Sequence, residues 1–108
     1  MSTTKETVEY ILDSLGRNKR FTVRAMFGEY ALYADSKVVA LICNDLLYIK
    51  ILPASHELED LCEKDAPYPG ARAHYVVSED QLTSIESLSN ILRAVATEVV
   101  VKKKKRVK

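Results

Sequence analysis

Lys50 is the residue whose position most needs a chemical explanation, because it interrupts an apolar run between Ile49 and Ile51. A lysine in a strand can extend along the sheet so that its ammonium group reaches water. Burying that group without a partner would cost several kcal/mol, roughly, so the alternative requires a carboxylate or a bound anion. Glu29 is one candidate carboxylate, because we expect it near the same strand ends.

Arg24 and three tyrosines are the residues we expect to share a sheet or a cleft with Lys50; the tyrosines are Tyr30, Tyr48 and Tyr75. Such a cleft could hold a phosphate or carboxylate group through charge-assisted hydrogen bonds. Arginine and tyrosine are also enriched at protein interfaces. The set therefore predicts either an anion pocket or a protein-binding surface, and both remain open.

Thiols and imidazoles give no comparable signal. Cys43 lies inside an apolar strand, where a cysteine is a small buried hydrophobic residue. Cys62 has acidic neighbours, which raise the pKa of a thiol and make it a poor nucleophile. His56 and His74 lack the spacing of a metal motif. We therefore expect no catalytic residue, no metal and no cofactor, and the sequence favours a protein that is not an enzyme.

Length and composition indicate one globular domain. The 108 residues have an apolar share of 47% and a charged share of 29%, both ordinary values. The first 20 residues do not resemble a secretory signal, and no stretch reaches the ~20 apolar residues that a membrane span requires. We expect a cytoplasmic protein with reduced thiols that does not contact membranes.

Charge is distributed unevenly along the chain. Six of the sixteen basic residues lie in residues 102–108, which leaves ten basic and fifteen acidic residues elsewhere, a net charge of −5. We expect a domain over residues 1–101 and a disordered basic tail from Lys102 to Lys108. Because an acidic body repels a phosphate backbone, nucleic acid should bind only weakly, through the tail if at all.

The first half of the chain predicts a helix followed by an antiparallel meander. Apolar residues at helical spacing predict a helix over residues 4–15, with Thr3 as its N-cap and Gly16 as its stop. Strands are expected over residues 21–27, 29–34, 38–43 and 46–51. The short turns at residues 35–37 and 44–45 require neighbouring strands to be antiparallel.

The second half predicts a short helix over residues 55–64 with Ser55 as N-cap, a fifth strand over residues 72–77, and a last helix over residues 85–99. A second capping box is expected at Ser78 and Gln81. The fold class is therefore α+β, a two-layer sandwich of helices and an antiparallel sheet.

Strand register predicts a surface that needs cover. With Asn44 and Asp45 as the turn, one face of the third and fourth strands carries paired apolar residues: Ile42 with Leu47, Ala40 with Ile49, and Val38 with Ile51. The other face is also largely apolar. Because an antiparallel sheet usually exposes one face to water, we expect cover from helices, from a second copy in a homodimer, or from both.

The strand block from Arg24 to Asp35, RAMFGEYALYAD, followed by ALI at residues 40–42 and LLYIK at residues 46–50, resembles the TfoX N-terminal domain family, related to the competence regulators TfoX and Sxy. The motif adds several residues to the candidate binding or family-motif set, namely Met26, Phe27, Gly28 and Tyr33. Gly28 is expected at a strand junction that needs a bulge or a positive φ. The resemblance covers roughly residues 8–97.

The resemblance implies an α/β sandwich around an antiparallel meander, often dimeric, with no established enzyme activity or ligand. Glu29 stands where a second glycine is common, and the chain stops before the helical C-terminal domain of the full-length regulators, so we do not carry over their transcriptional role. We expect a non-catalytic regulatory or protein-interaction module. The alternative is a protein that binds a small anion or metabolite, or an uncharacterised enzyme, using the Arg24, Lys50 and tyrosine cleft.

Overall fold

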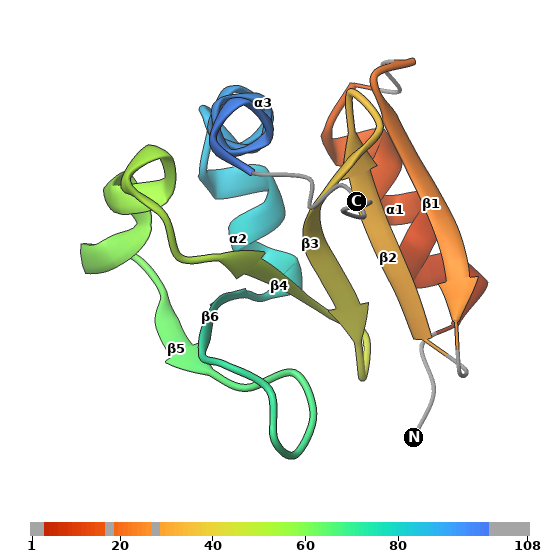
Figure 1. Ribbon diagram of the computed structural model, residues 1–108. Helices are drawn as coiled ribbons and strands as arrows, with labels where there is room; N and C mark the ends of the chain where they lie inside the picture. The colour runs from red at the N-terminus through yellow and green to blue at the C-terminus, as the bar shows by residue number, and fades with distance from the viewer. Residues whose placement is uncertain (1–3, 17–18, 27–28, 100–108) are drawn as a thin grey trace, which may run out of the picture.

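The computed structural model describes residues 4–16, 19–26 and 29–99, and Figure 1 shows their arrangement. An N-terminal helix, six strands, a 3-10 helix and two C-terminal helices follow one another. In order they are α1 Lys5–Ser14, β1 Phe21–Met26, β2 Glu29–Ala34, β3 Lys37–Cys43, β4 Leu46–Lys50, η1 Pro53–Asp60, β5 Glu63–Asp65, β6 His74–Val77, α2 Glu79–Ser84 and α3 Leu88–Glu98. The α+β class is confirmed.

All six strands form one antiparallel sheet in the order β1-β2-β3-β4-β6-β5. The predicted four-stranded meander forms one side of it. β6 then pairs with β4, and β5 lies outside β6 at the far edge. The sequence predicts five strands, and β5 is the strand that it misses.

Two tight turns set the register of the meander. Asp35 and Ser36 have φ values of 52° and 71°, and Asn44 and Asp45 have values of 51° and 63°. Positive φ at both central residues is what a type I′ hairpin turn requires, and Asn and Asp tolerate it. The Asn44–Asp45 turn is confirmed, whereas the other turn is shorter than predicted, because Lys37 already belongs to β3.

The predicted pairs Ile42–Leu47 and Ala40–Ile49 are confirmed, and all four side chains are fully buried. The pair Val38–Ile51 is wrong. β4 ends at Lys50, and Ile51 is 38% exposed. The chain leaves the sheet there because Pro53 opens η1 and cannot donate to a strand ladder.

Ser55 explains why the segment after β4 is a 3-10 helix rather than the predicted helix over residues 55–64. Its buried hydroxyl group accepts a hydrogen bond from Leu52 N at 3.0 Å and lies 2.8 Å from Lys50 O, to which it donates. Ser55 is thus the third residue of η1 and not an N-cap. The predicted end of that helix instead forms β5, which pairs with β6.

The helix ends also depart from prediction. Thr3 lies outside the described residues, and the hydroxyl group of Thr4 accepts the capping hydrogen bond from Thr7 N at 3.2 Å. Gly16 ends α1 with a φ of +88°, as expected. The capping contact at Ser78 is confirmed, since Gln81 Oε1 accepts a hydrogen bond from Ser78 N at 3.0 Å. It begins a separate helix, α2, which ends at the extended backbone of Ile85, so the predicted last helix starts at Leu88 and not at Ile85.

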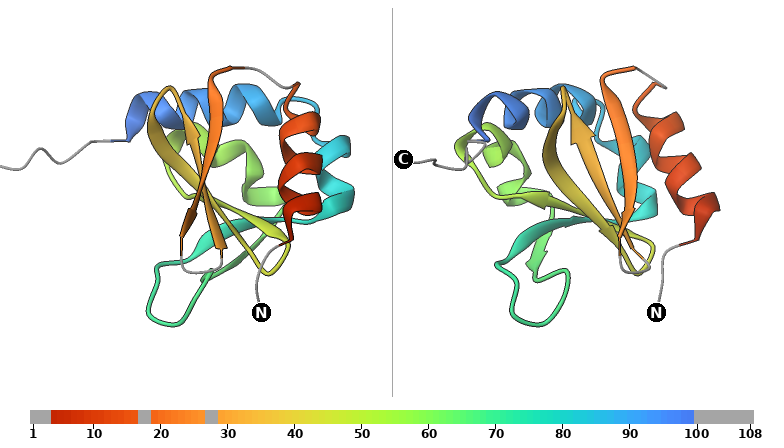
Figure 2. Two further views of the ribbon diagram at one scale, coloured as in Figure 1. Left: turned by 90° about the vertical axis from the view of Figure 1, so that its right-hand side faces the viewer. Right: turned by 45° about the vertical axis from the view of Figure 1, so that its right-hand side comes forward.

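The two faces of the sheet have different surroundings. Alternate strand residues, such as Leu32, Ile42 and Leu47, form one buried cluster with apolar residues of α1, α2 and α3. We call this side the core face. Figure 2 shows the helices gathered on that side and above the sheet. Among the described residues no helix lies over the opposite side, which we call the open face.

Candidate functional site

A continuous row of side chains crosses the open face. Strand pairing places one residue from each of the six strands side by side. In sheet order this central row consists of Arg24, Ala31, Leu41, Tyr48, Val76 and Glu63. Directly paired residues of an antiparallel sheet point to the same side, so the six side chains share one face.

The central row is apolar in the middle and charged at its ends. Ala31 and Tyr48 are buried, with exposed fractions of 1% and 5%. Leu41 and Val76 are half-buried, whereas Arg24 and Glu63 are exposed at the two edges of the sheet. Burial raises the pKa of Tyr48, and the charges of Asp65, Cys43 and Glu29 raise it further, so Tyr48 is a neutral phenol on this face.

A shorter row beside it contains Lys50, His74 and Asp65, again paired across β4, β6 and β5. Lys50 and His74 help to line a pocket of about 300 Å³, which we call the Lys50 pocket. Val38 and Leu41 contribute apolar surface from β3, and the loop between β5 and β6 contributes Tyr68, Ala71 and Arg72. This loop is the green-to-teal arc at the bottom of Figure 1.

His74 has a fixed orientation in this pocket. Its Nδ1 atom lies 2.9 Å from Arg72 O, and a carbonyl oxygen can only accept, so Nδ1 carries the proton. Burial lowers the pKa of His74, and the neighbouring Lys50 charge lowers it further, against the hydrogen bond to Arg72. The ring is therefore held as the neutral Nδ1–H tautomer.

The predicted site residues separate into two groups. Arg24, Tyr33, Tyr48 and Lys50 occupy open-face positions, and Met26 occupies an open-face position in β1. Tyr30 and Tyr75 lie on the core face instead. Phe27 and Gly28 lie outside the described residues. Arg24 and Lys50 belong to one sheet, as expected, but to different rows on β1 and β4, and Arg24 does not line the Lys50 pocket.

Tyr75 has a structural contact in place of the expected cleft. Its hydroxyl group donates a hydrogen bond to Glu59 Oε1 at 2.8 Å, and Lys64 Nζ lies 2.8 Å from Glu59 Oε2. Burial, with the hydrogen bond and charge of Glu59, raises the pKa of Tyr75 to about 12. Lys64 and Tyr75 together lower the pKa of Glu59. This contact joins η1 to β5 and β6.

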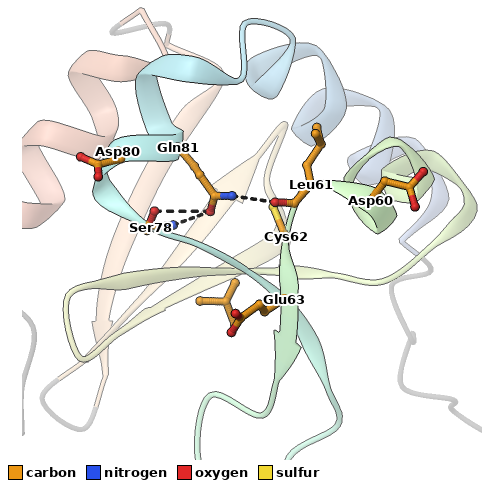
Figure 3. Close-up of a pocket in the computed structure, with 8 residues that line it drawn as sticks. Asp60, Leu61, Cys62, Glu63, Ser78, Asp80 and Gln81 are labelled. Atoms are coloured by element: carbon orange, nitrogen blue, oxygen red, sulfur yellow. Dashed lines mark hydrogen bonds between the residues drawn. The ribbon is translucent and has the colours of Figure 1, made fainter.

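A depression of about 650 Å³ lies where β5, β6 and α2 meet, and Figure 3 shows its lining. Gln81 Nε2 donates to Leu61 O at 2.7 Å, so the capping residue of α2 also holds the start of β5. Burial raises the pKa of the Cys62 thiol, which keeps it protonated. Glu63 projects to the other side of β6 from Gln81, as its place on the open face requires.

The remaining chemical candidates are the two cysteines and groups of possible metal ligands. Both cysteines are free and buried, and burial together with the Glu29 charge raises the pKa of Cys43. No cluster of three potential metal ligands occurs in the described parts of the chain. Within the same ranges, no helix is long and apolar enough to cross a lipid bilayer.

Three residues of the open face have no distinguishing signal in the sequence: Glu63, Tyr68 and Arg72. The sequence predicts a helix at Glu63, and the PYPG segment containing Tyr68 indicates only a loop. Arg72 belongs to the predicted fifth strand, which is longer than β6. Only strand pairing and the path of the β5–β6 loop bring these side chains to the same face as Lys50 and Tyr48.

An antiparallel α+β sandwich in which no described helix covers one sheet face is a class that accommodates binding modules as well as enzymes. The chain belongs to the family described as "TfoX N-terminal domain", whose pattern matches residues 12–98. It is also 33% identical over 108 residues to an "Uncharacterized 12.7 kDa protein in trpE 5'region" of Spirochaeta aurantia, across 100% of this chain and 93% of the relative. The expected family is confirmed.

Proposed function

We propose that this protein is a non-catalytic regulatory module that acts by binding proteins, and that its first partner is a second copy of the same chain. The observation that carries the proposal is the central row of the open face. Apolar side chains in the middle of a surface, with charged residues at its rim, are the usual composition of a protein interface.

The row is complementary to itself. A two-fold axis along the strands, passing between β3 and β4, would place the β1 edge of one copy over the β5 edge of the other. Arg24 of each copy then faces Glu63 of its partner, and Leu41 and Val76 meet apolar surface. Such isologous contacts are the commonest route to homodimers.

Because the middle of the row is already buried, a dimer can bury only a small additional apolar surface. Ala31, Cys43 and Tyr48 are already covered within one chain. The surface left for a partner is therefore the half-buried Leu41, Leu46 and Val76 with the exposed ends. This favours an interface that exchanges partners over a permanent dimer, since permanent interfaces are larger and more apolar.

Charge exchange tests the arrangement. Arg24→Glu and Glu63→Arg should each give a monomer in sedimentation equilibrium at micromolar concentration, because each places like charges together. The double variant should dimerise again, because it restores opposite charges in reversed order. Lys5→Glu is the matched control, since Lys5 is exposed on α1 away from the open face. A wild-type protein that stays monomeric, or a double variant that fails to recover, would refute this geometry.

The basic tail supports no second function here, because residues 102–108 lie outside the described residues. Weak, salt-sensitive binding of nucleic acid through the tail stays a prediction.

A further inference from the structure

The Lys50 pocket differs in chemistry from the central row beside it. Its apolar lining includes Val38 and Leu41 from β3. Its charged lining residues are Lys50 from β4 and Arg72 from the β5–β6 loop, and His74 is the strand partner of Lys50. Two permanent cations therefore converge on apolar surface within one chain.

Neither cation is satisfied by the protein in the described parts of the chain. No ion pair joins Lys50 or Arg72 to a carboxylate there, unlike two other cations: Arg20 lies 3.2 Å from Asp35, and Lys64 lies 2.8 Å from Glu59. Glu29, the carboxylate expected beside Lys50, instead accepts a hydrogen bond from Asn44 N at 3.3 Å. Lys50 is also half-buried, which makes an unpaired charge more costly than on an open surface.

We propose that the Lys50 pocket binds a small organic anion, in which a short apolar or aromatic group carries a carboxylate or phosphate. The volume of about 300 Å³ is at the lower end of the range for small-molecule sites, about 300 Å³ and above. The anionic oxygens lie between Lys50 and Arg72, and the apolar group rests on Val38 and Leu41. Tyr68, which is 55% exposed, covers the apolar group from the loop.

His74 adds a preference within this class. Its Nδ1–H group is engaged by Arg72 O, which leaves Nε2 as the ring nitrogen for the ligand. In the neutral ring Nε2 is an acceptor, so it suits a ligand that also carries a hydroxyl group. The same hydrogen bond joins the His74 ring to the backbone of the β5–β6 loop at Arg72.

The test is a titration of ¹⁵N-labelled protein with benzoate, phenyl phosphate and inorganic phosphate, followed by amide chemical shifts. Saturable shifts confined to residues 38–41, 50 and 68–74 are expected with the two aromatic anions. The anion that binds more tightly shows whether the pocket prefers a carboxylate or a phosphate. Inorganic phosphate should bind at least ten-fold more weakly, because it lacks the aromatic ring. The apolar surface that it fails to bury is on the order of one ring face. Equal binding of inorganic phosphate would overturn the ligand class.

Two variants and two controls locate the site. Lys50→Gln and Arg72→Gln should each weaken binding about ten-fold or more, the usual effect of removing a charge-assisted hydrogen bond. Lys5→Gln and Arg93→Gln remove the same charges from exposed positions on α1 and α3 and should leave binding unchanged. Unaltered binding in Lys50→Gln, or no saturable shift in the wild type, would overturn the proposal.

The pocket is built from one chain, so this inference does not depend on the proposed dimer. Arg24→Glu, which should abolish the dimer, is expected to bind phenyl phosphate as the wild type does. Loss of binding in that variant alone would contradict a single-chain pocket, whereas a monomeric wild type that binds the anion would refute only the dimer.

Discussion

Replacing Tyr75 with phenylalanine should destabilise the protein near neutral pH and stabilise it at high pH. The hydroxyl group of Tyr75 is on a ring that is 2% exposed, and it donates to Glu59 at 2.8 Å. At pH 8 its loss should reduce the free energy of unfolding by about 1.5 kcal/mol, the usual size for a hydrogen bond to a charged group.

Ionisation of Tyr75 changes the sign of the difference in unfolding free energy between the wild type and Tyr75→Phe. The pKa of Tyr75 rises from 10.0 to about 12 in the folded protein. A raised pKa stabilises the fold fully below the unfolded value near 10, and that contribution disappears as pH rises through 12. Two pKa units correspond to about 2.7 kcal/mol, at 1.36 kcal/mol per unit. Wild type should therefore lose its advantage over Tyr75→Phe at roughly pH 11 and be the less stable protein above it.

Urea denaturation at half-unit steps from pH 8 to pH 11.5 measures both proteins. Tyr10→Phe is the control, because Tyr10 is 36% exposed on α1 and its replacement should change stability by less than about 0.5 kcal/mol at pH 8. A difference between wild type and Tyr75→Phe that stays constant across this range would refute the argument, since it would mean that the phenol is not buried against Glu59.

Three further predictions concern the scaffold. Ser55→Ala should reduce the free energy of unfolding by about 2 kcal/mol, because it leaves Leu52 N and Lys50 O without their hydrogen-bond partner. The control Ser84→Ala removes an exposed hydroxyl group and should change stability little, so equal melting temperatures of the two variants would contradict this. Asp45→Gly keeps the positive φ but removes the carboxylate that accepts hydrogen bonds from Thr4 N and Thr7 Oγ1 at 3.0 and 2.9 Å, so it should cost about 1 kcal/mol at pH 7. Because the pKa of Asp45 is lowered, this cost should shrink as acid unfolding is followed below about pH 4, and a pH-independent difference would count against it. Cys43 and Cys62 should react with a thiol reagent at neutral pH only as fast as the protein unfolds, and rapid labelling in native buffer would show that they are not buried.

The elements that depend on local chemistry could be predicted from the sequence. Apolar spacing placed α1 and most of α3, and paired Asn and Asp residues placed the turn that sets the register of Ile42 with Leu47. The RAMFGEYALYAD motif indicated the family. These features are decided within a few residues of each other, so neighbouring residues alone carry the information.

The site could be predicted only in part. Lys50 was recognisable because a lysine in an apolar strand breaks the pattern, but its neighbours were not. The sequence grouped it with Arg24 and Tyr75, whereas the sheet places Arg24 three strands away and turns Tyr75 to the core face.

By itself, then, the sequence determined an α+β domain with an antiparallel meander, two hairpin turns and one lysine in an otherwise apolar strand. Tertiary structure decided that Glu63–Asp65 is a strand, because its pairing with β6 replaces the helical hydrogen bonds that its own residues allow. It also decided that β6 inserts between β4 and β5, which brings His74 and Arg72 to Lys50. Pairing between segments distant in the chain depends on which strand edge is free to form hydrogen bonds and on which side chains the core can bury. Neighbouring residues in the sequence determine neither.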